Sequence, residues 1–265
     1  MSEANINDKE EALDSVRKNG LALEYISEDL RNDKEVVLVA VGENGNALRL
    51  ASEDFRENKE VVLAAVRNKG CSLIFASENL RADKEVVLAA VSQNGFALEK
   101  ASQDLRRDKE VVLAAVQQTI YSLQMASPTM REDKDIMLVS VANDGCNLNL
   151  ARGNLRDDKE LVLVAVADCG LSLNYASDNL KEDKDIVLAA VRQNGYALKY
   201  ASDYLRDTED IVFEAVKQED EAILYASERI QEKISGLEHY GTMVEIFLYL
   251  DRISRVKSAK MGKVV

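Results

Sequence analysis

Clusters of acidic residues are the part of this 265-residue sequence whose type and spacing most readily suggest chemistry. The segments 157–160 and 182–185 each place three acids around a lysine. Carboxylate oxygens are the ligands that Ca²⁺ and Mg²⁺ prefer, so each segment is a candidate for divalent-metal binding. Neither segment belongs to a loop of alternating acids with a central glycine and a distant glutamate, which EF-hand proteins use. The competing interpretation, that Asp158 and Asp183 cap helices, is favoured, and we expect no metal site.

Nucleophiles and proton-transfer groups are sparse. His239 is the only histidine, and the three cysteines are Cys71, Cys146 and Cys169. An odd number of cysteines without a close pair argues against disulfides and favours a reducing, cytoplasmic location. No glycine-rich phosphate loop, G-x-S-x-G or H-E-x-x-H motif is present. We therefore expect no catalytic residues and no cofactor. An enzyme of unrecognised type remains the alternative, because the many carboxylates could include a pair that performs acid–base chemistry.

The elements that position these residues follow a repeat of 25 residues that needs no gaps. Each of nine copies begins with a residue whose side-chain oxygen can cap a helix N-terminus. Lysine follows in eight copies and an acid then follows in all nine, which suits the first turn of a helix. The nine first residues are Asp8, Asp33, Asn58, Asp83, Asp108, Asp133, Asp158, Asp183 and Thr208.

An apolar run and then a glycine follow the cap, as Val36–Val41 and Gly45 do in the second copy. The cap before the run and the glycine after it indicate a helix near Lys34–Asn44, with the glycine in the left-handed C′ conformation. A shorter second helix is predicted near Asn46–Ser52, followed by a 3₁₀-like turn that a serine caps.

Two helices this short must bury their apolar faces against neighbouring copies, which is how solenoids fold. The predicted fold class is all-α, an α-solenoid of nine 25-residue helix–turn–helix repeats with a C-terminal capping helix. Its parts are an N-terminal segment (1–7), the repeats (8–232), and a cap helix with a basic tail (233–265). Glu11 replaces valine in the first copy, as expected of an exposed end. The recurring lysines and arginines, such as Lys34 and Arg56, are expected to form ion pairs between adjacent copies.

The repeat resembles a known family. The motif D-K-E-V-V-L-A-A-V, followed by Q-N-G-x-A-L-x-x-A-S-x-x-L-R, is clearest at Asp83–Val91 and Arg192–Arg206. It is similar to helical repeats catalogued as a domain of unknown function, which occur in protists, in their large viruses and in intracellular bacteria. The resemblance covers residues 8–232 and implies helical repeats and host-associated biology. It implies no reaction, ligand or catalytic residue.

Charge is distributed unevenly along the chain. The net charge is −13, although residues 252–265 carry five basic residues and no acid. The rest of the chain is therefore strongly acidic and repels phosphate backbones, which argues against nucleic-acid binding. Residues 242–263 have apolar positions at helical spacing beside the basic residues. They are interpreted as the cap helix, with binding to a membrane surface as the alternative.

Two sets of variable positions are candidate partner-binding surfaces. The first is an acidic edge between the second helix and the next cap, which would attract a basic partner. The second is a row of aromatic residues at two positions of the second helix, directly after the glycine and five residues after it, which would line a groove. Packing between repeats is the competing interpretation. The candidate residues are Glu53, Asp54, Asp178, Glu182, Asp203 and Asp207 for the edge, and Phe96, Tyr175, Tyr196, Tyr200 and Tyr225 for the row.

These observations favour a non-enzymatic scaffold that binds another protein, with a host protein as one kind of partner. The alternative is a regulatory or targeting module that uses the basic C-terminal helix at a membrane. The expected state is a monomer in the cytoplasm, or in the host cytosol if the protein is delivered as an effector.

Overall fold

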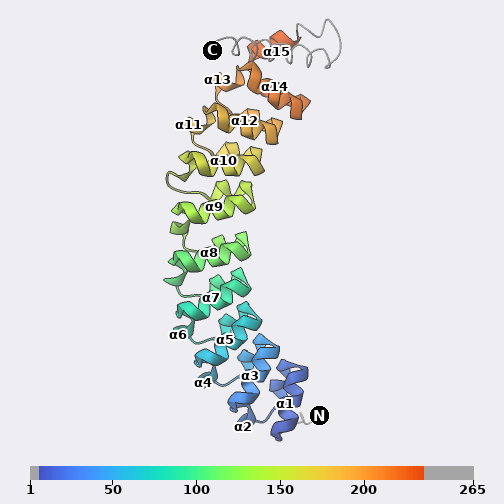
Figure 1. Ribbon diagram of the computed structural model, residues 1–265, viewed down its shortest axis with the longest axis vertical. Coiled ribbons are helices and arrows are strands. Elements are labelled where there is room, and N and C mark those ends of the chain that lie inside the picture. The colour runs from blue at the N-terminus through green and yellow to red at the C-terminus, as the bar shows by residue number, and fades with distance from the viewer. Residues whose placement is uncertain (1–5, 236–265) are drawn as a thin grey trace, which may run out of the picture. The chain divides into compact units, whose positions relative to one another are not determined.

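The computed structural model describes residues 6–235, and the chain divides into two compact units, residues 1–139 and 140–265. The first helix of each repeat is α-helical and ten residues long. Figure 1 shows these helices side by side within each unit. They are α1 (Lys9–Lys18), α3 (Lys34–Glu43), α5 (Lys59–Asn68), α7 (Lys84–Gln93) and α8 (Lys109–Gln118) in unit 1, α10 (Lys159–Asp168), α12 (Lys184–Gln193) and α14 (Glu209–Gln218) in unit 2, and α9 (Lys134–Asn143) where the units divide.

The predicted N-caps are confirmed in eight of the nine repeats. Asp33, for example, accepts hydrogen bonds from the backbone N–H groups of Glu35 and Val36 at 2.9 and 3.3 Å. Thr208 makes no side-chain cap. The capping residues are Asp8, Asp33, Asn58, Asp83, Asp108, Asp133, Asp158 and Asp183.

Each repeat continues with a 3₁₀-helix and then a third, short helical turn, so the predicted α-helical second element is wrong in type. In the second repeat, Gly45, Leu48 and Ala51 are all buried. Their spacing of three matches the three residues per turn of a 3₁₀-helix. The 3₁₀-helices are η1 (Gly20–Tyr25), η2 (Gly45–Leu50), η3 (Gly70–Phe75), η4 (Gly95–Lys100), η6 (Ile120–Gln124), η8 (Gly145–Leu150), η10 (Gly170–Tyr175), η11 (Gly195–Tyr200) and η12 (Asp220–Tyr225).

The third element is one short turn in most repeats, α-helical in six copies and 3₁₀-helical in the fourth to sixth. The serine before it caps it in several copies, as Ser77 does for the N–H of Leu80. The last of these turns extends through Ser235, beyond the predicted end of the repeats at residue 232. The turns are α2 (Glu28–Arg31), α4 (Glu53–Arg56), α6 (Glu78–Arg81), η5 (Leu105–Arg107), η7 (Pro128–Glu132), η9 (Leu155–Asp157), α11 (Asp178–Lys181), α13 (Asp203–Arg206) and α15 (Glu228–Ser235).

The repeated glycines serve close packing rather than a left-handed backbone, which corrects the predicted C′ role. Among residues 6–235 only Gly153 has a positive φ, and it is not one of the glycines that follow the first helix of a repeat. A Cβ on Gly45 would lie 2.3 Å from the carbonyl oxygen of Ala65 in the next repeat. The same close approach recurs at Gly20, Gly70, Gly95, Gly145, Gly170 and Gly195.

The core lies between stacked repeats, as the apolar circumference of the first helix predicts. In α5 the side chains of Val61, Val62, Ala65 and Val66 are fully buried. Helix α5 contacts both α3 and α7, so each of its apolar sides faces a neighbour. Apolar burial of this kind is the main driving force of folding in repeat proteins.

Two ladders of polar contacts link adjacent repeats. The N–H of Ser77 donates to the carbonyl of Arg56 at 3.0 Å, and the same bond recurs along both units. The predicted lysine ion pairs are confirmed: Lys59 lies 2.8 Å from Asp83 and 2.9 Å from Glu85 in the next repeat. Exposed pairs of this kind are worth roughly 0–1 kcal/mol each.

Arg106 and Arg206, near the ends of the fourth and eighth repeats, bind the main chain of the next repeat and do not form the predicted ion pair between copies. Arg206 Nε donates to the carbonyl oxygen of Tyr225 in the next repeat at 2.6 Å. Arg106 makes the equivalent bond to Met125. The prediction for Arg56 is wrong as well, because within residues 6–235 Arg56 forms no ion pair and its buried Nε has no hydrogen-bond partner; the same holds for the Nε atoms of Arg31, Arg81 and Arg131.

The first repeat is completed by the segment before it. The carbonyl of Ile6 accepts a hydrogen bond from the N–H of Ser27, as Arg56 does from Ser77. Glu11 is exposed, which confirms the prediction for the first copy. No helix among residues 6–235 is long and apolar enough to cross a membrane. The predicted cap and membrane helix, residues 242–263, lies outside the described residues.

Candidate functional site

Three of the predicted tyrosines gather on the 3₁₀-helices of unit 2. The rings of Tyr196 and Tyr225 meet edge to face, with centroids 6.3 Å apart. The Lys199 ammonium lies 5.9 Å from the centroids of both Tyr200 and Tyr225. All three tyrosines are half-buried, so each ring packs between repeats and still presents part of its surface to solvent. We call Tyr196, Lys199, Tyr200 and Tyr225 the tyrosine cluster.

A hydrogen bond fixes the orientation of Tyr196. Its hydroxyl donates to the carboxylate of Glu221 in the next repeat at 3.1 Å. This bond, together with desolvation, raises the pKa of Tyr196 above its usual value of 10.0. The phenol therefore stays protonated near neutral pH and acts as a hydrogen-bond donor rather than as a base.

The other two predicted aromatic residues are not part of the cluster. Tyr175 is half-buried and covers the guanidinium of Arg156, whose Cζ lies 5.9 Å from the ring centroid. Phe96 belongs to unit 1 and is 42% exposed. The sequence placed these five residues at two repeat positions, and the structure brings only Tyr196, Tyr200 and Tyr225 together.

The predicted acidic residues lie on the short turns that follow the 3₁₀-helices. In unit 2, Asp178 and Asp203 begin α11 and α13 with fully exposed side chains. Each pairs with a basic residue one turn later, at 3.6 Å for Lys181 and 3.2 Å for Arg206. Ion pairs between exposed side chains are weak because water screens the attraction between the two charges. The pairs therefore reduce the negative potential around Asp178 and Asp203 but do not remove it.

The remaining acidic residues differ in solvent exposure and in whether a basic side chain binds them. Glu182 is exposed at the end of α11, whereas Asp207 accepts a hydrogen bond from Arg229 at 2.9 Å. That bond is the main reason that the pKa of Asp207 lies below its usual value. In unit 1, Glu53 and Asp54 are exposed at the start of α4. In unit 2 the exposed carboxylates of the edge are those of Asp178, Glu182 and Asp203; these three residues are called the acidic edge of unit 2.

The sequence interpretation missed two exposed residues in unit 2. Lys199 joins the tyrosine rings, and its only signal was a basic residue next to Tyr200. Tyr204 is 78% exposed on α13, beside Asp203. It stands where most copies have aspartate or asparagine, so comparison of equivalent positions would have singled it out.

The expectation that no cysteines pair is wrong. Cys146 and Cys169 form a disulfide with their Cα atoms 5.6 Å apart. The repeat explains the pairing, because the residue after the glycine lies beside the C-cap residue of the next repeat. In unit 1 the equivalent residues are Cys71 and Asn94, whose side-chain amide donates to the sulfur at 3.3 Å. The cysteine spacing is therefore no argument for a reducing compartment.

The acidic segments considered for metal binding have structural partners. Asp158 caps α10 by accepting from the N–H of Leu161 at 3.0 Å, and Asp183 caps α12, which confirms the capping interpretation. Over residues 6–235 the structure holds no group of three His, Cys, Asp or Glu side chains placed to bind a metal ion.

Comparison with known proteins identifies the repeat. The model of a family described as "Domain of unknown function (DUF4116)" matches residues 8–56, 58–106, 83–131, 108–156, 133–181, 158–206 and 183–231. Comparisons with curated proteins and with solved structures found no match. Because the successive matches step along the repeats and cover nearly all of residues 8–231, the chain belongs to the DUF4116 family.

Proposed function

We propose that this protein is a non-enzymatic scaffold that binds another protein through unit 2. The tyrosine cluster supplies contact area, and the acidic edge of unit 2 attracts a basic surface. The observation that carries the proposal is the grouping of Tyr200 and Tyr225 around Lys199, with Tyr196 edge to face on Tyr225 and part of each ring exposed.

Aromatic residues that are already ordered are efficient contact residues. Tyrosine is enriched at protein interfaces because it combines apolar area with a polar tip and loses little conformational entropy. The cluster is held by Lys199 and Glu221 before any partner arrives. Preorganisation of this kind favours binding because fewer side chains must be ordered on association.

The division of labour within the repeat supports the same proposal. Buried valine, alanine and leucine, the capping aspartates and the glycines recur, and they build the frame. The exposed positions after the glycine and on the short turns differ from copy to copy. Solenoids present extended surfaces of this kind to protein partners.

The experiment is capture of partners on the immobilised full-length protein from a eukaryotic lysate, quantified by mass spectrometry at low and high salt. We expect an enriched protein with a basic surface that is lost at high salt, because salt screens exposed charges. Reversing the edge by Asp178→Lys with Asp203→Lys should also release it. The control is Glu43→Lys, which reverses an exposed acid at the end of α3 in unit 1.

The contribution of the cluster is tested separately. Truncation of an interface hot spot costs about 2 kcal/mol, or roughly thirtyfold in Kd. Tyr200→Ala with Tyr225→Ala should weaken capture at least this much. Tyr25→Ala is the matched control, because Tyr25 occupies the same repeat position in unit 1 and is 50% exposed. Capture that survives both unit 2 variants would contradict the proposal.

A further inference from the structure

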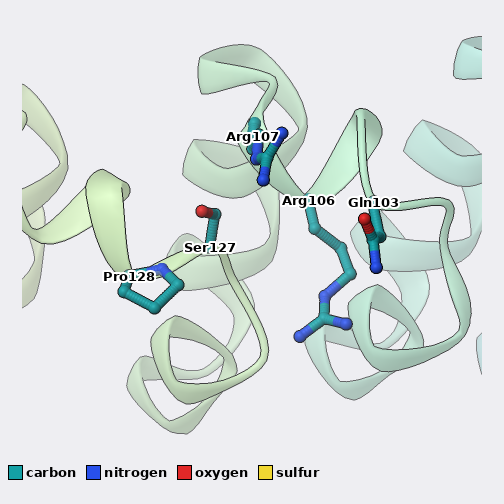
Figure 2. Close-up of a pocket in the computed structure, with 5 residues that line it drawn as sticks. All are labelled: Gln103, Arg106, Arg107, Ser127 and Pro128. Atoms are coloured by element: carbon teal, nitrogen blue, oxygen red, sulfur yellow. The ribbon is translucent and has the colours of Figure 1, made fainter.

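A hollow of about 200 Å³ lies in unit 1 at the junction of the fourth and fifth repeats. Gln103, Arg106 and Arg107 line it from one repeat, and Ser127 and Pro128 line it from the next. Figure 2 shows Ser127 and Pro128 on one side, Arg106 and Gln103 on the other, and Arg107 between them. Arg106 is half-buried and Arg107 is exposed, so one guanidinium is fixed and the other can adjust.

The equivalent junction in unit 2 is built around a carboxylate. Asp157 accepts a hydrogen bond from the hydroxyl of Ser177, and Asp207 accepts one from the hydroxyl of Ser227. Arg229, two residues after Ser227, also donates to Asp207 at 2.9 Å. At these junctions the carboxylate at the end of one repeat is thus the hydrogen-bond acceptor, and side chains at or just after the serine of the next repeat are the donors.

At the hollow this arrangement keeps its donors and loses its acceptor. Ser127 presents the same hydroxyl, and Thr129, 3.1 Å from it, takes the place of Arg229. Opposite them stands Arg107, at a position where six of the nine copies have an acid. Those acids are Glu57, Glu132, Asp157, Glu182, Asp207 and Glu232.

The two arginines have no carboxylate of their own. Arg106 Nε donates to the main-chain oxygen of Met125, which leaves its terminal nitrogens facing the hollow. Within residues 6–235 neither Arg106 nor Arg107 makes an ion pair within 4.0 Å. Two guanidiniums, the hydroxyl of Ser127 and the amide of Gln103 therefore line one small hollow in a protein whose net charge is −13.

We infer that this hollow binds the phosphate group of a phosphorylated serine or threonine side chain. A phosphate monoester carries nearly two negative charges and three acceptor oxygens, which match the two guanidiniums and the Ser127 hydroxyl. Arginine is suited to this role because its fork makes paired hydrogen bonds to phosphate oxygens. The phosphate would occupy the place that Asp157 and Asp207 fill at the unit 2 junctions.

The surroundings favour a peptide over a phosphate-rich polymer or membrane. Glu53, Asp54 and Glu78 lie exposed on the short turns of the preceding repeats in unit 1. These acids repel an array of phosphates but attract lysine and arginine. The ligand is thus a single phosphorylated residue with basic residues near it. The site lies wholly in unit 1, so it is separate from the tyrosine cluster and does not depend on the proposed function.

The test uses two short peptide libraries that are degenerate except for a central phosphoserine or a central serine. Fluorescence anisotropy with the full-length protein should show that the phosphorylated library binds at least about tenfold tighter, as one charge-assisted hydrogen bond predicts. Arg107→Glu should abolish this preference. This variant places at residue 107 the acid that six other copies carry, so the junction should fold as those junctions do.

Matched variants complete the design. Arg67→Glu makes the same charge change at an exposed arginine of α5 and should leave the preference intact. Ser127→Ala should reduce it several-fold, and it keeps the main-chain bond from Ser127 to Arg106. Tyr200→Ala with Tyr225→Ala should leave it unchanged, which separates this site from the proposed function.

Three results would overturn the inference. The first is equal binding of the two libraries, and the second is a phosphoserine preference that persists in both Arg107→Glu and Ser127→Ala. The third is tighter binding, lost in Arg107→Glu, to vesicles that contain a phosphoinositide than to the phosphorylated library. That result would assign the hollow to a lipid headgroup.

Discussion

The role assigned to the repeated glycine predicts opposite effects for two glycines three residues apart. A Cβ added to Gly45 meets the carbonyl oxygen of Ala65 at 2.3 Å, whereas ordinary contact begins near 3.4 Å. Gly45→Ala must therefore push two repeats apart by about 1 Å, and overpacking of this kind costs roughly 3 kcal/mol. Gly42 lies in α3 with no atom within 4 Å of an added Cβ. Gly42→Ala should stabilise by about 0.5 kcal/mol, because alanine restricts the unfolded chain and favours helix.

Urea unfolding followed by circular dichroism measures both changes. With a slope of about 2 kcal/mol per molar, the midpoint should fall by about 1.5 M for Gly45→Ala and rise slightly for Gly42→Ala. Gly45→Asn separates close packing from backbone conformation, because asparagine tolerates a left-handed φ but adds still more bulk. An asparagine variant that is more stable than the alanine variant, or an alanine variant as stable as the parent, would refute the packing argument.

Other consequences concern pH and cross-linking. Hydrogen bonds from lysines lower the pKa of Asp33, Asp83 and Asp183, so their contribution to stability is complete above the usual aspartate range and is lost as pH falls through the lowered values. The urea midpoint should thus drop on acidification below about pH 4. Asp83→Asn should flatten that drop, because asparagine does not titrate but can still cap α7, as Asn58 caps α5. An unchanged dependence of the midpoint on pH in this variant would contradict the role of the lysine–aspartate ion pairs. Asn94→Cys should form a disulfide with Cys71 on air oxidation, detectable as loss of free thiol by mass spectrometry, because Cys146 and Cys169 pair at the equivalent positions. Closing a loop of this length should stabilise by about 3 kcal/mol, and reduction should remove the gain; a variant that keeps two free thiols would show that the register is wrong.

Much of the frame was predictable because it depends on local and periodic signals. The caps at Asp33 and its equivalents, the apolar first helix and the lysine ladder each follow from residue type at a fixed position. Predicted and observed first helices agree almost to the residue, since α3 ends at Glu43 and Asn44 is its C-cap.

The second element was harder to predict because its length permits either helix type. Leu48 and Ala51 are three residues apart, which suits an α-helix as well as a 3₁₀-helix. The decisive signal was the buried Gly45, which extends the same spacing by one more step. The role of Gly45 was misjudged because glycine is common at a helix end either for its left-handed conformation or for close packing. Only the position of the neighbouring repeat distinguishes the two roles.

The candidate site was predicted only in part. Repeat position singled out Tyr196, Tyr200 and Tyr225, but it did not predict which rings meet, because that depends on Lys199 and on side-chain direction. The disulfide was missed because the sequence argument relied on the odd number of cysteines and on their distance along the chain. Residues that touch across two adjacent repeats are separated in sequence by slightly less than the 25-residue repeat, as the separation of 23 between Cys146 and Cys169 shows.

The most direct test of the proposed binding role is hydrogen–deuterium exchange of the full-length protein with and without the partner obtained by capture. The proposal predicts slower exchange in η11, η12 and α13 of unit 2, where the tyrosine cluster and Asp203 lie, and unchanged exchange in η1 and α2 of unit 1. Slower exchange confined to the long helices α12 and α14, with η11, η12 and α13 unaffected, would contradict it.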